Sequence, residues 1–161
     1  MSEPAHKEPA DVTILYIDAD ACPVKDEALE IAERHGAECV LVSNGGMRPS
    51  RYPYARIVTV TAGADVADDW IVEQAVRGDV VVTADIPLAA RALEKGALVL
   101  NSNGRDFTPE SIGTALSMRA FSQHLRETGE SKGYNAVFTP ADRSRFRQSL
   151  DRSLRNAARS T

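Results

Sequence analysis

Six aspartates follow three short apolar runs of the chain, at positions where buried strands would end. The runs span residues 12–17, 57–60 and 80–83. The aspartates are Asp18 and Asp20 in DADACP, Asp65, Asp68 and Asp69 in GADVADD, and Asp85 in TADIPLA. The i, i+3, i+4 spacing of the middle group places its carboxylates on one face of a helix. If the three runs lie in one parallel sheet, all six aspartates reach the same edge of it.

Such a group of aspartates supports the chemistry of a hard metal ion. Carboxylates a few ångströms apart repel and raise each other's pKa, and Mg²⁺ or Mn²⁺ relieves that repulsion through oxygen ligands. One or two such ions suit phosphodiester hydrolysis, because one lowers the pKa of an attacking water and another stabilises the leaving oxygen. We therefore expect a metal-dependent nuclease site with catalytic Asp18, Asp65, Asp69 and Asp85, and with Asp20 and Asp68 as further metal ligands.

Each of these aspartates also has a purely structural interpretation. Asp20 and Asp85 could cap the helices that follow them. The group in GADVADD could complement the dipole at a helix N-terminus, and either Asp68 or Asp69 could be the member that faces inward. The convergence of three segments favours the metal site over these separate roles.

A basic and aromatic loop, GGMRPSRYPYAR, spans residues 45–56 and contains no acidic residue. Arginines that track phosphates and rings that stack on bases form a platform for single-stranded nucleic acid. The alternative is an ordinary surface loop with its tyrosines packed underneath. The candidate substrate contacts are Arg48, Arg51 and Arg56, Tyr52 and Tyr54, the preceding Ser43 and Asn44, and Thr83 in TADIPLA.

Basic residues are concentrated near the end of the chain. Residues 140–161 contain six arginines and two aspartates, whereas the whole chain has a net charge of −4. An acidic body with a basic end favours a polyanionic partner, to whose phosphates these arginines could add contacts. The alternative is a solvated helix face.

The elements that must position these residues alternate between strands and helices. The apolar runs are continuous, as strands buried on both faces require, and this predicts a three-layer α/β/α fold with a mostly parallel five-stranded sheet. Ligands of such sheets bind at the carboxyl ends of the strands. We expect a flexible leader over residues 1–11 and one domain over 12–160 that closes with a basic helix over 139–159. Thr139 and Pro140, with Asp142 at the third helical position, can start this helix. The expected strands are 12–17, 38–43, 57–60, 80–83 and 97–100, and the helices are 23–35, 65–77, 87–95 and 108–127.

Length and composition bound the class of protein. The chain has 161 residues, 43% of them hydrophobic and 26% charged, which is typical of one globular domain. It contains no run of 18 apolar residues and no apolar signal segment, so we expect a cytoplasmic protein without a membrane partner. Two cysteines cannot form a disulfide scaffold or a four-cysteine zinc site.

Several motifs together resemble the YaiI/YqxD family of small bacterial proteins. They are DADACP, GADVADDWIV, GDVVVTADIPLA, KGALVLN and DRSRFRQSLDRSL, and the resemblance covers about residues 13–155. It implies a PIN-like, NYN-related nuclease fold and an RNA substrate with Mg²⁺ or Mn²⁺. The positions that match the acidic residues of PIN-like nucleases are Asp18, one or more of Asp65, Asp68 and Asp69, and Asp85 in the turn that begins at Thr83.

Two other functions fit the same residues. A haloacid-dehalogenase-type phosphatase also carries a D-x-D motif after its first strand, and Asp18 would then be the nucleophile and Asp20 the acid/base. A PIN-like domain could also bind RNA or a protein without cutting it. The sequence leaves the oligomeric state open.

Overall fold

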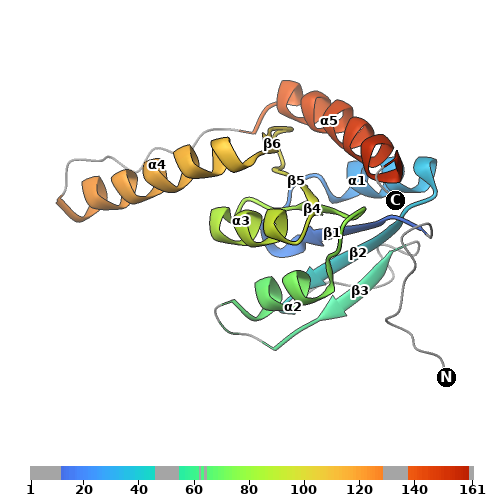
Figure 1. Ribbon diagram of the computed structural model, residues 1–161, viewed down its shortest axis with the longest axis horizontal. Helices are drawn as coiled ribbons and strands as arrows, with labels where there is room; N and C mark the ends of the chain where they lie inside the picture. Colours follow the sequence, from blue (N-terminus) through green and yellow to red (C-terminus); the bar gives the residue numbers. More distant parts are fainter. Residues whose placement is uncertain (1–11, 46–54, 62, 64, 129–137, 160–161) are drawn as a thin grey trace.

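The computed structural model describes residues 12–45, 55–61, 63, 65–128 and 138–159. The expected leader and most of the basic, aromatic loop, including Arg48, Arg51, Tyr52 and Tyr54, lie outside these residues. The chain alternates strands and helices as predicted (Figure 1). Its elements are β1 (Ile14–Asp18), the 3-10 helix η1 (Ala19–Ala21), α1 (Lys25–His35), β2 (Glu38–Ser43), β3 (Arg56–Thr59), α2 (Val66–Gln74), β4 (Val80–Val82), α3 (Ile86–Glu94), β5 (Leu98–Leu100), β6 (Asp106–Phe107), α4 (Pro109–Thr128) and α5 (Pro140–Arg159).

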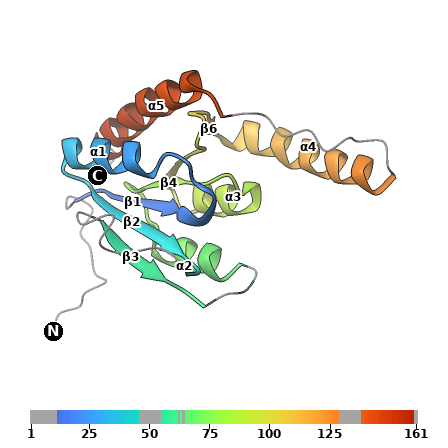
Figure 2. The same cartoon turned by 180° about the vertical axis from the view of Figure 1, so that it is seen from behind.

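The strands form one sheet in the order β3-β2-β1-β4-β5-β6. The five predicted strands are present and run parallel. A sixth strand, β6, pairs antiparallel with β5 and was not predicted, because two residues carry no recognisable pattern. The chain builds the sheet outward from β1 to β3 and then returns to place β4 on the other side of β1 (Figure 2).

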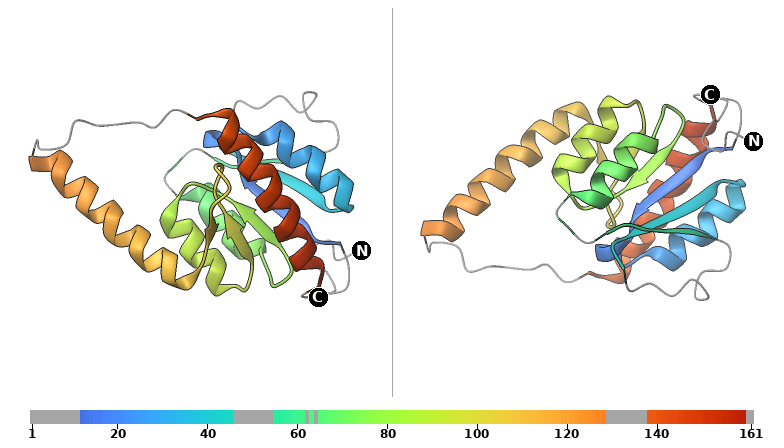
Figure 3. Two further views of the ribbon diagram at one scale, coloured as in Figure 1. Left: turned by 90° about the horizontal axis from the view of Figure 1, so that it is seen from above. Right: turned by 90° about the horizontal axis from the view of Figure 1, so that it is seen from below.

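Helices cover both faces of the sheet and complete the predicted three layers. In β1, Leu15 and Ile17 pack on the face covered by α1 and α5, whereas Tyr16 packs on the face covered by α2 and α3. This alternation follows from the period of two in a strand. The two views in Figure 3 show α5 crossing one face and α2 and α3 lying on the other. Both cysteines are free and buried.

Helix α5 is docked by an apolar stripe and a close backbone contact. Phe146, Leu150 and Leu154 are buried in the core that α5 shares with α1 and the sheet. The buried Ser149 hydroxyl donates to the carbonyl of Gly104 at 2.6 Å. A Cβ at Gly104 would lie 2.6 Å from the backbone of α5, so only glycine permits this approach.

The predicted start of α5 is confirmed as a reciprocal cap. The Asp142 amide donates to the Thr139 hydroxyl at 3.1 Å, and the Thr139 amide donates to the Asp142 carboxylate at 2.9 Å. The hydrogen bond from the Thr139 amide contributes most to lowering the pKa of Asp142, and the bond with the Thr139 side chain adds to it.

The arginines of α5 bind acidic residues of this same chain. Arg143 pairs with Glu27 at 2.8 Å, and Arg147 pairs with Glu30 at 2.9 Å, both across to α1. Arg152 pairs with Asp106 at 3.1 Å. Arginines of the basic end therefore form ion pairs with acidic residues of the body of the same chain.

Helix α4 extends away from the body (Figures 1 and 3). Ile112 in its second turn is buried against α3 and the sheet, whereas Leu116 and Met118 are exposed. No helix among the residues described is long and apolar enough to cross a bilayer.

Candidate functional site at the carboxyl edge of the sheet

The aspartates gather where the direction of sheet building reverses. Strands β1 and β4 are neighbours, yet the chain leaves β1 toward β2 and leaves β4 toward β5. Such a switch point opens a crevice beyond the carboxyl ends of the two strands, and ligands of parallel sheets bind there. Asp18 is the last residue of β1, and Thr83 and Asp85 follow β4.

Thr83 links the segments after β1 and β4. Its hydroxyl donates to the Asp18 carboxylate at 3.0 Å and accepts from the Asp85 amide at 3.0 Å. Because Thr83 is buried, its hydroxyl positions Asp18 instead of facing a substrate. Burial raises the pKa of Asp18, the Thr83 hydrogen bond opposes that shift, and the charges of Asp85 and Asp20 add to it.

Asp85 caps α3, as its structural interpretation anticipated. One of its carboxylate oxygens accepts from the Leu88 amide at 2.8 Å. This bond fixes the side chain at the helix N-terminus. Its charge still raises the pKa of both Asp18 and Asp68. The capping role and membership of the acidic cluster therefore coexist in one residue.

Asp68 joins this cluster from α2. Burial raises its pKa to about 6, with further contributions from the charges of Asp85, Asp18 and Asp65. Asp69, which the sequence slightly favoured as the inward member, is exposed and forms an ion pair with Arg91 of α3 at 2.9 Å. Asp68, and not Asp69, is therefore the partly buried member of the pair whose pKa responds to the charges of Asp18 and Asp85.

Asp65 is the residue before α2 and has a left-handed backbone, with φ of 69°. Its side chain caps no helix amide, so the predicted place on one helix face with Asp68 and Asp69 is not realised. Asp is among the residues that tolerate this conformation. Its exposed carboxylate contributes to the cluster through its charge on Asp68.

Asp20 and the end of β2 form a separate hydrogen-bonded unit. The Ser43 hydroxyl donates to one oxygen of Asp20 at 2.8 Å, and the backbone N–H of Asn44 donates to the other at 3.0 Å. Ser43 is fully buried, so it positions Asp20 and cannot contact a substrate. Asp20 lies in η1 and does not cap α1, whose N-cap is Val24.

The remaining predicted contact lies off this edge. Arg56 is the first residue of β3, in register with Val40, whereas Asp18 is in register with Val42. It is exposed at the amino end of its strand. Arg56 therefore stands two residues behind the edge that carries the aspartates.

Cys22 lies next to the cluster but is a packed thiol. It is buried in the core, and this burial raises its pKa. The nearby Lys25 amine donates to the Cys22 carbonyl at 2.6 Å. A thiol with a raised pKa is a poor nucleophile, which agrees with the packing role expected from its lack of a neighbouring histidine.

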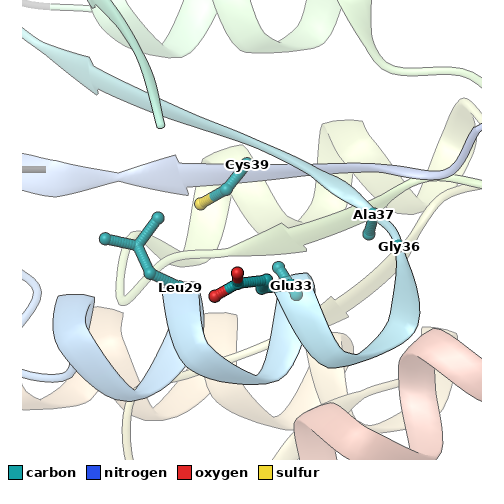
Figure 4. Close-up of a pocket in the computed structure, with 6 residues that line it drawn as sticks. Leu29, Glu33, Gly36, Ala37 and Cys39 are labelled. Carbon is teal, nitrogen blue, oxygen red and sulfur yellow. The ribbon is translucent and has the colours of Figure 1, made fainter. Parts of the chain in front are cut away.

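A cavity of about 250 Å³ lies elsewhere, between α1 and the amino end of β2 (Figure 4). Its walls are apolar except for the Glu33 carboxylate. It is separated from the aspartates by the length of the strand, because Cys39 is the second residue of β2. The lining residues are Leu29, Ala32, Glu33, Gly36, Ala37 and Cys39.

The acidic cluster is not a complete protein cage for a metal ion. Among the residues described, no group of three His, Cys, Asp or Glu side chains could hold a metal ion as they stand. The carboxylates nevertheless provide an all-oxygen donor set, and burial first, with their mutual repulsion second, raises the pKa of Asp18 and Asp68. Mg²⁺ usually keeps several waters and takes one or two carboxylates together with substrate phosphates.

One residue of this edge escaped the sequence analysis. Arg91 lies on the exposed side of α3, pairs with Asp69, and lowers the pKa of Asp68. The available signal was its position on the helix that Asp85 caps, six residues after Asp85.

Comparisons with known proteins agree with the resemblance read from the motifs. The model of the family described as "Uncharacterized BCR, YaiI/YqxD family" matches residues 16–156. A UPF0178 protein of Mesorhizobium japonicum is 65% identical over 146 residues, which is 91% of this chain and 94% of that protein. UPF0178 proteins of Agrobacterium fabrum and Rhizobium meliloti are 59% and 58% identical and cover 88% and 91% of this chain, with 92% and 100% of their own lengths. No solved structure matches the chain, so the PIN-like fold stays a prediction.

Proposed function

The chain belongs to the YaiI/YqxD family, and we propose that it is a Mg²⁺- or Mn²⁺-dependent phosphodiesterase that cleaves single-stranded nucleic acid, RNA in the first place. The preference for RNA follows from the resemblance to PIN-like nucleases. The proposed carboxylates are Asp18, Asp68 and Asp85, with Asp20 and Asp65 around them.

One observation carries the proposal. Asp18 at the end of β1 and Asp85 after β4 are joined through the Thr83 hydroxyl, at 3.0 Å from the Asp18 carboxylate and 3.0 Å from the Asp85 amide, at the switch point of a parallel sheet. The charges of both raise the pKa of Asp68. Carboxylates brought together in this way destabilise one another unless a cation or a proton joins them. A cation at this edge of the sheet would relieve both the burial of Asp18 and Asp68 as charged groups and their repulsion, which supports the proposal.

The chain's own residues orient the carboxylates. Thr83 holds one oxygen of Asp18, and the Leu88 amide holds one oxygen of Asp85. These bonds fix the two side chains on neighbouring segments. A bound divalent cation would supply an activated water and stabilise charge on the phosphate. Whether one or two ions bind depends on how many of the other carboxylate oxygens coordinate a metal ion.

A phosphatase of the haloacid-dehalogenase type finds less support. That chemistry needs a lysine at the phosphate. The two lysines in the described part of the chain, Lys25 and Lys95, donate to the carbonyls of Cys22 and Val72.

Cleavage of end-labelled single-stranded RNA and DNA in Mn²⁺ tests the proposal. The wild-type chain should cut at least one substrate, and the double variant Asp18→Asn/Asp85→Asn should lose at least about 100-fold in rate, since it removes two charges from the reacting centre. Asparagine keeps the shape of aspartate and remains a good N-cap, so α3 should stay capped. Glu30→Gln, on the opposite face of the sheet, is the matched control and should cut as the wild type does.

Three outcomes would contradict the proposal. Binding of RNA without cleavage, unchanged in the double variant, would indicate a non-catalytic binding domain. Turnover of a phosphomonoester, with an aspartyl-phosphate mimic trapped at Asp18, would indicate a phosphatase. Cleavage that persists in the double variant would place the active site elsewhere.

A further inference from the structure

Arg91 places a positive charge at the rim of the acidic cluster. Its Nη1 lies 2.9 Å from an Asp69 oxygen, and its charge also reaches Asp68. Asp68 is in turn the α2 member of the cluster with Asp18 and Asp85. The guanidinium, in the last turn of α3, is therefore tied to α2 at the residue that follows Asp68, and its charge acts on Asp68.

The ion pair that holds Arg91 is weak and open to exchange. The Arg91 side chain is 45% exposed and that of Asp69 is 57% exposed. Pairs of this exposure contribute about 0–1 kcal/mol. The bond to Asp69 uses Nη1, and a guanidinium carries five N–H donors in a planar fork that matches a phosphate. A phosphate can thus compete for this side chain.

A basic side chain near a cluster of carboxylates would help a negatively charged substrate to bind. Its aspartates repel a polyanion, and a cation at the rim offsets that repulsion along the path of the chain of phosphates. The arginines of α5 lie on the other face of the sheet, where Arg143 and Arg147 pair with acidic residues of α1. Arg91 is on the α2 and α3 face, next to the cluster.

We propose that Arg91 is a phosphate-contact residue of this site, with Asp69 as its partner in the unliganded state. The guanidinium exchanges the Asp69 carboxylate for a backbone phosphate of a single-stranded nucleic acid. This inference rests on the proposed function. It has a consequence that a purely structural ion pair lacks: removing the charge of Arg91 must weaken binding of the polyanion and strengthen binding of the metal ion.

Two titrations test the inference on the full chain. Anisotropy of a fluorescein-labelled single-stranded RNA of about 12 nucleotides, with Ca²⁺ as the oxygen-binding cation, measures polyanion binding at several salt concentrations. Calorimetry with Mn²⁺ alone measures the metal site. Arg91→Gln should bind the RNA about 10-fold more weakly, with a salt slope smaller by about 0.7. The same variant should bind Mn²⁺ about threefold more tightly, because a like charge has gone.

The chain offers a closely matched control for this pair. Arg147 and Glu30 also lie 2.9 Å apart, with side chains 42% and 54% exposed, and they join α5 to α1. Arg147→Gln should leave the RNA affinity, the salt slope and the Mn²⁺ affinity unchanged. Asp69→Asn should bind the RNA about threefold more tightly, because it frees Arg91 and removes a negative charge, whereas Glu30→Gln should not. Arg91→Lys keeps the charge but not the fork, so it should retain the salt slope and lose part of the affinity.

The two titrations separate failure of this inference from failure of the proposed function. If Mn²⁺ binds as expected and Arg91→Gln leaves RNA affinity and salt slope unchanged, Arg91 is only a surface ion pair. If the wild-type chain binds no Mn²⁺, the proposed function fails, and this inference fails with it. Loss of RNA binding in Arg147→Gln to the same extent would also contradict it, because the effect would then be general charge and not this site.

Discussion

The two faces of the sheet handle charge in opposite ways. Between α1 and α5, each acidic residue discussed has a basic partner, as in Arg143 with Glu27 and Arg147 with Glu30. At the carboxyl edge, Asp18, Asp68 and Asp85 form no ion pair with a basic residue in the described part of the chain, and burial together with their charges raises the pKa values of Asp18 and Asp68. Matched charges orient a helix at little net gain or cost, whereas unmatched charges store repulsion that a ligand can relieve. The contrast is the reason why we propose the site at the carboxyl edge and assign the α1–α5 pairs a structural role.

The largest effect should come from the apolar contacts of the matched face. Phe146 is fully buried in the core that α5 shares with α1, so Phe146→Ala should lower the free energy of unfolding by about 3–5 kcal/mol. Urea denaturation followed by circular dichroism measures this loss. Leu116→Ala, on the exposed side of α4, is the control and should change stability by less than about 0.5 kcal/mol. Equal effects for the two variants would show that α5 is not docked through its core stripe.

Removing one carboxylate from the unmatched edge should stabilise the chain. The pKa of Asp68 rises from 3.8 to about 6 in the fold, so the folded state binds more protons than the unfolded state between these values, and stability falls as pH rises through this window. Asp68→Asn should therefore gain about 1 kcal/mol over wild type at pH 7.5, after allowance for partial exposure. The gain should vanish near pH 4.

Thermal or urea unfolding at pH 4 and 7.5, in the presence of a chelator, measures this difference. Asp69→Asn is the matched control on the same helix, since it breaks an exposed pair with Arg91 and should give no stabilisation at either pH. If Asp68→Asn were less stable than wild type at pH 7.5, the cluster would not be repulsive, and the contrast between the two faces would fail.

The smallest effect should come from the matched pairs themselves. A double-mutant cycle on Arg147 and Glu30 should give a coupling energy of about 0.5 kcal/mol or less, because both side chains are about half exposed. Urea denaturation of the two single variants and the double variant gives this energy. A coupling above about 2 kcal/mol would mean that ion pairs, and not the apolar stripe, hold α5 on α1.

The sequence predicted the parallel strands, the three layers and the cap at Thr139 because each depends on a local pattern. It could not decide between Asp68 and Asp69, since i+3 and i+4 positions share one helix face. The rotation of α2 decides it, and that rotation is set by the burial of Ile71 and the edge contact of Trp70 with Tyr16.

Other features depend on residues far apart in the chain. The arginines of α5 looked available for phosphates because their partners on α1 lie more than 100 residues away, as for Arg143 and Glu27. Ser43 and Thr83 looked like substrate contacts, yet both are buried and orient Asp20 and Asp18. Small hydroxyl residues beside a carboxylate serve either role, and only burial separates the two.

Calorimetric titration of Mn²⁺ tests the cation site at the carboxyl edge. The wild-type chain should bind Mn²⁺ with a dissociation constant between the micromolar and sub-millimolar range, as expected for an ion held by few carboxylates and several waters. The double variant Asp18→Asn/Asp85→Asn should lose this binding, and Glu27→Gln/Glu30→Gln, which removes two carboxylates from the matched face, should retain it. No binding to the wild type, or equal binding to the two double variants, would show that the converging aspartates are caps and surface charges and not a metal site.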